Sequence, residues 1–308
     1  MIDQIFSIRD DFPAVDYQQW RELAEASLKG ASFEKKLVTN SYEGVKLLPI
    51  YTSADRLSEG DATGLPGQPP YVRGGAPLGS VATGWDLRQE HSQPEPAAFN
   101  AAVLSDVDAG VSSLQLVFDR AGQLGLDPDN EQSKDVVGSA GLMAYLADDL
   151  DAALNDVDLA NVGVSLEPGA AFLPASALLV ALWQKRQVPL AKVSAAFNAD
   201  PLGVLARNGH LPYSVESALA QLSDLAQWTG ANCPQATAVG VDTSPYHHAG
   251  ATATQDLAVA MATAAQYMRS MIESGIPADD AARQIQFRIS IGTHQFLAIA
   301  KLRAIRPL

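Results

Sequence analysis

Cysteine is almost absent from this chain of 308 residues, which contains only Cys233. A lone cysteine cannot form a disulfide within the chain, so we expect a reducing compartment and a buried, apolar role for this side chain. The sequence also lacks an apolar run of about 18 residues, and its N-terminus has no cationic stretch leading into an apolar one. These absences argue against a membrane-spanning helix and a secretory signal, and they predict a cytoplasmic protein.

Basic residues are in short supply: 21 lysines and arginines stand against 35 aspartates and glutamates, which gives a formal net charge of −14. A surface this acidic repels the phosphates of nucleic acids and of anionic lipids, so neither a nucleic acid nor a membrane is an expected partner. The apolar share of 47% is ordinary for a globular protein, and the length suffices for a large buried core.

Residues 1–80 differ in pattern from the remainder of the chain. A helix with one apolar face is predicted after Asp16, which suits the N-cap position, and it should stop at Gly30. Apolar segments on either side of SYEG (41–44) indicate a hairpin. Residues 58–80 are then rich in glycine, proline and polar residues, which predicts a loop or an extended arm.

From residue 81 onward, short apolar or β-branched runs alternate with longer segments rich in alanine and leucine. The predicted strands are 85–89, 113–119, 161–166, 192–197, 237–242 and 286–291. The predicted helices are 97–109, 138–154, 171–187, 214–228, 252–274 and 278–284, with a last helix starting near His294. Alternation with connections of this length predicts parallel strands joined by right-handed crossovers.

Two architectures fit this α/β alternation: a doubly wound open sheet and a (β/α)8 barrel of the TIM type. The open sheet would usually carry a Gly-x-Gly-x-x-Gly loop after an early strand, and the sequence has none there. A closed barrel needs eight β/α units, whereas the patterns give six. Either two strands escape the pattern, or the barrel is truncated after about six β/α units and has two unpaired edges.

A set of ordered motifs extends over essentially the whole chain. They are WRELAEASLKGASFEKKL (20–37), LPGQPPYVRG (65–74), GWDLRQ (84–89), VFDRAGQLGLDPD (117–129), DPLGVLARNG (200–209), AGATATQDLAVAMA (249–262) and IGTHQFLAIAKLRAIR (291–306). Together they resemble the methylmalonyl-CoA mutase family. The resemblance implies a (β/α)8 barrel that surrounds acyl-CoA, with residues 81–308 as an incomplete barrel, and a C-terminal domain that carries adenosylcobalamin. It also implies interconversion of (R)-methylmalonyl-CoA and succinyl-CoA, for which the cofactor supplies the radical chemistry.

Two departures from the family bear on activity. The Asp-x-His-x-x-Gly loop, whose histidine ligates cobalt in the family, is absent from the sequence, so we expect no cobalamin-binding domain and no cofactor on this chain. Aligning residues 249–252 with the family's Ala-Gly-Ala-Thr places Ser244 and Pro245 where active members have Tyr and His. The register also places Ser80 where they have another pocket Tyr. Proline has no donor for a thioester oxygen, so no catalytic residue is expected here.

These substitutions resemble the small (β) subunit of heterodimeric bacterial mutases. That resemblance implies a large catalytic subunit as the partner in a heterodimer, with adenosylcobalamin on that partner. Whether acyl-CoA still binds is left open. Arg207 is a candidate for pairing with the substrate carboxylate, and Arg73 is a candidate for contact with a CoA phosphate or, alternatively, an anchor for the arm.

His247 and His248 stand side by side before an alanine-rich segment and invite a metal-site interpretation. Neighbouring residues in a regular element cannot face the same way, and a metal site needs three or four convergent ligands. Capping or interface roles are therefore favoured over metal binding, and a residual ligand contact is the other alternative.

The leading functional interpretation is a structural, non-catalytic subunit of a methylmalonyl-CoA mutase. One alternative is an acyl-CoA barrel that works with a cobalamin domain on a separate chain. Another is a truncated fragment without an independent function.

Overall fold

The computed structural model describes residues 15–55, 63–79, 81 and 84–308. The first part contains α2 (Tyr17–Ser27), α3 (Phe33–Leu37), β1 (Thr39–Asn40), β2 (Lys46–Leu47) and the 3-10 turn η1 (Ser53–Asp55). The strands of the large sheet are β3 (Arg88–His91), β4 (Ser113–Val117), β5 (Gly163–Glu167), β6 (Ala195–Ala199), β7 (Ala236–Asp242) and β8 (Ile285–Arg288). The helices around this sheet are α4 (Pro96–Asp108), α5 (Arg120–Gln123), α6 (Ala147–Ala153), α7 (Phe172–Lys185), α8 (Pro201–Asn208), α9 (Val215–Asn232), α10 (Ser244–His248), α11 (Ala253–Glu273), α12 (Ala278–Arg283) and α13 (Gln295–Ala304), with 3-10 turns η2 (Glu131–Ser133) and η3 (Leu190–Lys192).

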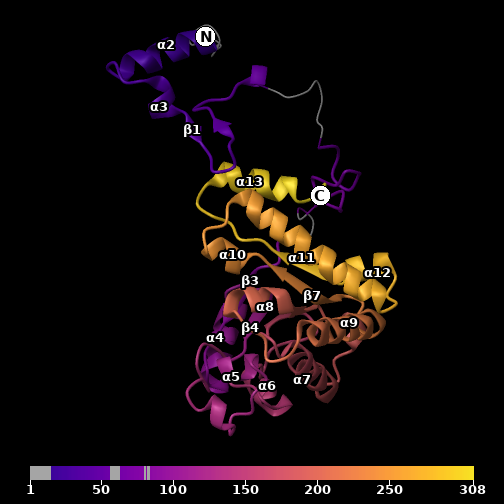
Figure 1. Ribbon diagram of the computed structural model, residues 1–308. Helices are drawn as coiled ribbons and strands as arrows, with labels where there is room; N and C mark the ends of the chain where they lie inside the picture. Colours follow the sequence, from indigo (N-terminus) through magenta and orange to yellow (C-terminus); the bar gives the residue numbers. More distant parts are fainter. Residues whose placement is uncertain (1–14, 56–62, 80, 82–83) are drawn as a thin grey trace, which may run out of the picture.

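All six strands of the large sheet run parallel, and their order in space is their order in sequence, from β3 to β8 (Figure 1). A doubly wound sheet reverses its strand order at a switch point, so this sequential winding favours the barrel type over the open sheet. Helices α4, α7, α9, α11 and α12 contact the strands, as expected for crossover helices.

The sheet curves enough for side chains from its two edge strands to meet. Arg288, at the end of β8, places Nη2 3.3 Å from Oε2 of Glu90 on β3. Among the described residues, β3 and β8 each pair with one neighbouring strand, so the outer edge of each is open. The prediction of a TIM-type barrel interrupted after six β/α units is confirmed.

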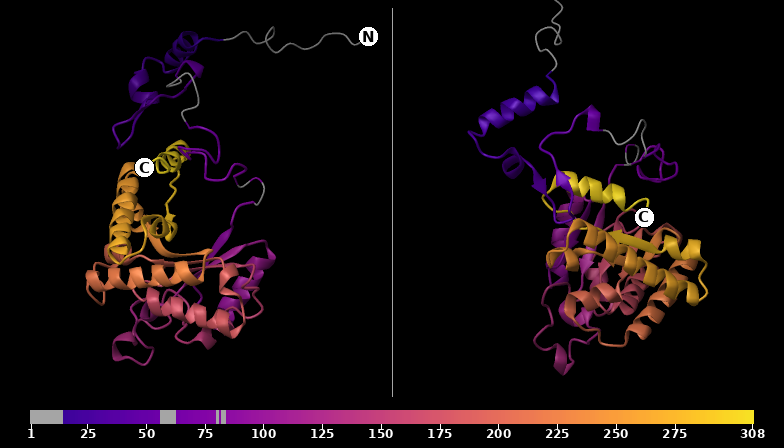
Figure 2. Two further views of the ribbon diagram at one scale, coloured as in Figure 1. Left: turned by 90° about the vertical axis from the view of Figure 1, so that its right-hand side faces the viewer. Right: turned by 45° about the horizontal axis from the view of Figure 1, so that its top comes forward.

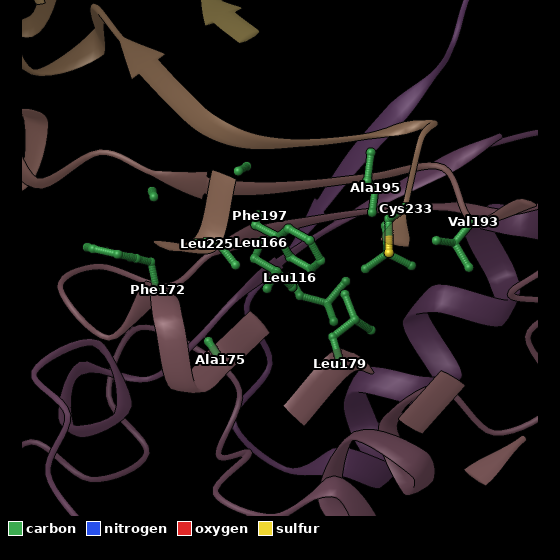
Figure 3. Close-up of a cluster of buried hydrophobic side chains, with 14 of the residues drawn as sticks. Leu116, Leu166, Phe172, Ala175, Leu179, Val193, Ala195, Phe197, Leu225 and Cys233 are labelled. Atoms are coloured by element: carbon green, nitrogen blue, oxygen red, sulfur yellow. The ribbon is translucent and has the colours of Figure 1, made fainter. Parts of the chain in front are cut away.

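The core lies between the outward side chains of the central strands and the helices that cover them. Leu116, Leu166 and Phe197 extend from β4, β5 and β6, and Phe172 of α7 belongs to the same cluster (Figure 3). Side chains alternate between the two faces of a strand, so this apolar face leaves the other face free for polar residues. Cys233 lies buried in this core, which confirms its predicted apolar role.

Helices α2 and α3 stand away from the barrel in both views of Figure 2. Asp16 caps α2 as predicted, because its Oδ1 accepts the N–H of Gln19 at 2.8 Å in a capping box. The apolar face of α2 has little cover: Trp20 packs edge-on against Phe33, with 6.1 Å between ring centroids, but no residue of the helix is buried. The predicted hairpin is present, with two residues in each strand.

Residues 63–79, the described part of the segment predicted as a loop or an extended arm, form a run of turns. Gly64, Gly67 and Gly74 adopt positive φ angles of 65°, 74° and 105°, a region that glycine enters without strain. The N–H of Gly67 donates to the carbonyl of Gly74 at 2.8 Å, which folds the segment back on itself.

The predicted helix over 138–154 is wrong in its first half, because α6 begins at Ala147. Gly141 packs so closely against the end of β4 that a Cβ would overlap the carbonyl oxygen of Phe118. The next residue, Leu142, donates its N–H to the carbonyl of Val117 at 2.7 Å. Backbone that is bonded to the end of a strand cannot also form an intrahelical ladder.

None of the described helices is both long and apolar enough to cross a bilayer.

Candidate functional site

The concave side of the sheet encloses a cavity of about 300 Å³ at the carboxyl ends of the strands, the end at which barrel enzymes place their sites. Inward positions two residues apart along the strands line it. These include Arg88 and Glu90 of β3, Gln115 of β4, Ser165 and Glu167 of β5, Asn198 of β6, Gly240 and Asp242 of β7, and Gln286 and Arg288 of β8. Barrel interiors are usually packed with branched apolar side chains, so this polar lining is a specific property of the chain.

The middle layer of the cavity is a set of neutral hydrogen bonds. Asn198 donates through Nδ2 to the hydroxyl of Ser165 at 2.9 Å and to the carbonyl of Leu166 at 2.8 Å. Gln115 donates through Nε2 to Oε2 of Glu167 at 2.8 Å, which links this layer to the charged one above it.

Five charged side chains form the upper layer of the cavity. The guanidinium of Arg207, at the end of α8, pairs with Glu167 through Nη1 and with Asp242 through Nη2 at 2.7 Å. Arg288 pairs with Glu167 at 2.6 Å and with Glu90 at 3.3 Å. Three carboxylates against two guanidiniums leave the layer with a formal charge of −1.

Glu167 lies at the centre of this network, with 16% of its side chain exposed. Burial alone would raise the pKa of its carboxyl, but the guanidiniums of Arg207 and Arg288 outweigh burial and hold this pKa below its ordinary value. The carboxylate is therefore ionised and fully engaged, which suits an electrostatic clamp rather than a proton donor.

The structure brings Ser244, Pro245 and Arg207 together. They line a depression at the cavity mouth, together with Glu167 and Arg288. Ser244 begins α10 and donates both its N–H, at 2.8 Å, and its hydroxyl, at 2.7 Å, to the carboxylate of Asp242.

Arg73 does not line this cavity or its mouth. It is exposed on a turn of the 63–79 segment, beside Gly74, where an added Cβ would lie 3.7 Å from the guanidinium of Arg306. The roles of Arg73 and Arg207 in substrate binding stay predictions, and Ser80 lies outside the described residues.

The two adjacent histidines face different cavities, in line with the argument that they cannot point the same way. His248 lines the mouth beside Pro245. The ring of His247, whose centroid is 6.2 Å from that of His248, is instead directed at α11, with Nδ1 3.2 Å from Oδ2 of Asp256. Within the described parts of the chain, no three His, Cys, Asp or Glu side chains converge as a metal site would require.

The residues that matter most in the charged layer stand in no recognisable motif. Glu90, Glu167 and Arg288 are each the last or next-to-last residue of a strand. A charged residue at the inward end of a parallel strand is a signal that could have found them, since functional groups of barrels gather there.

Asp200 lies behind the charged layer as the N-cap of α8. Its carboxylate accepts the N–H groups of Gly203 and Asp242, each at 3.0 Å, and the hydroxyl of Tyr267. Burial raises the pKa of Asp200 to about 6, with a further contribution from repulsion by Asp242.

We expect Asp200 to make the chain less stable as the pH rises through about 6. Its pKa is about 6 in the folded chain and about 3.9 in an unfolded one, so folding favours the protonated form. The stabilisation is fully present below the unfolded value and is lost as the pH rises through the folded value, by at most about 1.4 kcal/mol per pH unit.

Urea unfolding at several pH values between about 4.5 and 7 tests this. The free energy of unfolding of Asp200→Asn, relative to the wild type, should increase with pH. A difference that stays constant across this range would contradict the prediction.

A family model for methylmalonyl-CoA mutase matches residues 40–308. The chain is 34% identical over 313 residues to a methylmalonyl-CoA mutase small subunit of Streptomyces virginiae, which covers 99% of this chain and 46% of that protein. It is 31% identical to the methylmalonyl-CoA mutase of Escherichia coli (94% of this chain, 41% of that one) and 28% identical to the mitochondrial enzyme of Mus musculus (95% and 39%). The chain thus spans less than half the length of these relatives, and it belongs to the methylmalonyl-CoA mutase family.

Proposed function

We propose that this chain is a structural, non-catalytic component of a methylmalonyl-CoA mutase, of the small-subunit kind. The proposal rests on the first two residues of α10. In the register of the family resemblance, Ser244 and Pro245 occupy the positions of the pocket Tyr and His. Pro245 has no donor, and the hydroxyl of Ser244 is committed to Asp242 at 2.7 Å. Neither can stabilise charge on a thioester oxygen.

The charged layer supports the same proposal. Both guanidiniums of the charged layer, those of Arg207 and Arg288, already pair with carboxylates of the chain. A substrate carboxylate would have to displace Glu167 or Asp242, and each displaced carboxylate would remain partly buried without its partner. Such a displacement costs free energy rather than supplying it.

The mutase family depends on cobalamin, and we place that cofactor on the partner subunit. Three of the five histidines of this chain offer a poor fit for a cobalt ligand. His91 is buried in the barrel wall beside Phe99, His247 is held by Asp256, and the ring of His294 caps α13 by accepting the N–H of Leu297. In the described residues, every strand belongs to the hairpin or to the barrel sheet.

Exposed apolar side chains indicate where the partner would bind. Most of the large ones in the described residues fall within two stretches, 15–87 and 287–308. They include Leu23, Tyr42, Val81, Trp85, Leu87, Phe287, Ile291, Phe296 and Ile299. Apolar surface on this scale is typical of a protein interface, and these two stretches flank the open sheet edges.

The test is to mix the chain with a cobalamin-binding large mutase subunit from the same genome and measure co-elution by size-exclusion chromatography. We expect a stable complex. Phe296→Glu should weaken it at least tenfold, because a charge would enter an apolar contact. Leu146→Glu is the matched control, since Leu146 is also exposed but lies outside both stretches. A chain that stays monomeric beside the large subunit would overturn the assignment of a partner.

Activity assays separate this proposal from its alternative. The chain alone, and the chain mixed with an isolated cobalamin domain, should show no interconversion of (R)-methylmalonyl-CoA and succinyl-CoA. Turnover with the isolated domain would support the alternative of a substrate barrel that borrows its cofactor domain.

A further inference from the structure

A second cavity, of about 390 Å³, lies outside the barrel, between the hairpin and the helices α11 and α13. Figure 1 shows α13 between the hairpin and α11. The residues that line this second cavity come from three distant parts of the sequence, and none of them lines the barrel cavity. The turn of the hairpin forms one wall, because Glu43 accepts the N–H of Ala253 at the start of α11, with 3.0 Å between Oε1 and N.

The floor of this cavity contains a buried ion pair with one unsatisfied oxygen. Asp256 is fully buried. Its Oδ2 accepts a hydrogen bond from the ammonium of Lys301 and lies 3.2 Å from Nδ1 of His247. Its other oxygen, Oδ1, is buried and has no hydrogen-bond partner among the described residues. A buried carboxylate oxygen without a donor is costly and requires an explanation.

The charges around the cavity limit the kind of ligand that could donate a hydrogen bond to Oδ1 of Asp256. When the histidines are counted as neutral, the positive charge of Lys301 cancels the negative charge of Asp256. Glu43 then leaves the cavity with a formal charge of −1. An anion would be repelled by both carboxylates, and a second cation would lie beside Lys301. A neutral group that both donates and accepts a hydrogen bond fits, since Lys301 uses one N–H on Asp256 and one on the carbonyl of Ser290 at 2.8 Å.

The remaining walls are largely apolar: Leu47 from the hairpin, Ala251 before α11, and Leu297 and Ala298 from α13. We propose that this cavity binds a small neutral molecule that carries a carboxamide or hydroxyl group on a compact apolar body. Its N–H or O–H donates to Oδ1 of Asp256, and its oxygen accepts from the ammonium of Lys301. This site is independent of the mutase assignment.

Four probes of one shape test the charge argument: benzamide and benzyl alcohol as neutral ligands, benzoate and benzylamine as charged ones. Titrations followed by ligand-observed NMR and calorimetry should show saturable binding for at least one neutral probe. Binding of the charged probes should be at least tenfold weaker. Absence of saturable binding by both neutral probes, or equal affinity for a charged one, would overturn the proposal.

Variants locate the binding. Asp256→Ala leaves Lys301 unpaired and endangers folding, so the better change is Ala298→Phe, which fills the cavity and leaves the ion pair intact. It should reduce probe affinity at least tenfold. Ala300→Phe on the exposed side of α13 is the control and should leave affinity unchanged. Equal binding in both variants would show that the probe binds elsewhere and would refute the site.

Discussion

Replacing Lys301 with methionine should lower the free energy of unfolding by about 3–5 kcal/mol, the largest effect we expect from a single substitution. The side chain of Lys301 is 5% exposed, and that of its partner Asp256 is 0% exposed. Methionine matches the lysine stem in volume but leaves a buried carboxylate with His247 as its remaining partner. The carbonyl of Ser290 also loses its donor. Urea denaturation at neutral pH measures the loss.

A double variant distinguishes the ion pair from simple packing. Asp256→Leu combined with Lys301→Met removes both charges, and it should recover a large part of the loss because no buried charge remains unpaired. Lys185→Met is the control: its ammonium pairs with Asp148 and Asp151 but is about half exposed, so its loss should stay below about 1 kcal/mol. Equal losses in Lys301→Met and Lys185→Met would contradict this account.

Glu167→Gln should destabilise the chain by about 2–3 kcal/mol. Glu167 joins β5 to α8 through Arg207 and to the edge strand β8 through Arg288. The effect stays below that of Lys301→Met because 38% of the Arg207 side chain and 44% of the Arg288 side chain are exposed, so water compensates part of the loss.

The pH dependence of this difference has a defined sign. The pKa of Glu167 is lowered in the folded chain, so its stabilisation is present above the unfolded value of about 4.3 and is lost as the pH falls through the folded value. The gap between wild type and Glu167→Gln should therefore be widest near pH 7 and should narrow below about pH 4. Glu131→Gln, at a side chain that is 92% exposed, should change stability by less than about 0.5 kcal/mol at every pH.

Much of the fold follows from the sequence because each β/α unit repeats a local signal. A buried strand and the amphipathic helix that covers it are encoded within about 30 neighbouring residues, so six units could be placed to within a few residues. The signal fails between Gly138 and Leu146, where alanine and leucine suggest a helix. Close packing of Gly141 against Phe118 decides the backbone there, and this contact is tertiary.

The candidate site was predictable only in part. Ser244, Pro245 and Arg207 stand in motifs, and the structure places them around one mouth. The ion pairs of the charged layer join residues far apart in sequence, such as Glu90 and Arg288, which are separated by 198 residues. No local pattern encodes such a pair, because it forms only when the sheet curves and its two edges approach each other.

The single turn of α10 gives the chain two spectroscopic reporters of different sites. The ring of His248 lines the barrel mouth, and that of His247 lines the outer cavity between the hairpin, α11 and α13. The two residues are neighbours in the sequence. Imidazole NMR signals from this one turn would therefore show, in a single titration, whether a ligand enters the barrel, the outer cavity or both. The two ring centroids are 6.2 Å apart, so the ring with the larger shift marks the cavity that the ligand enters.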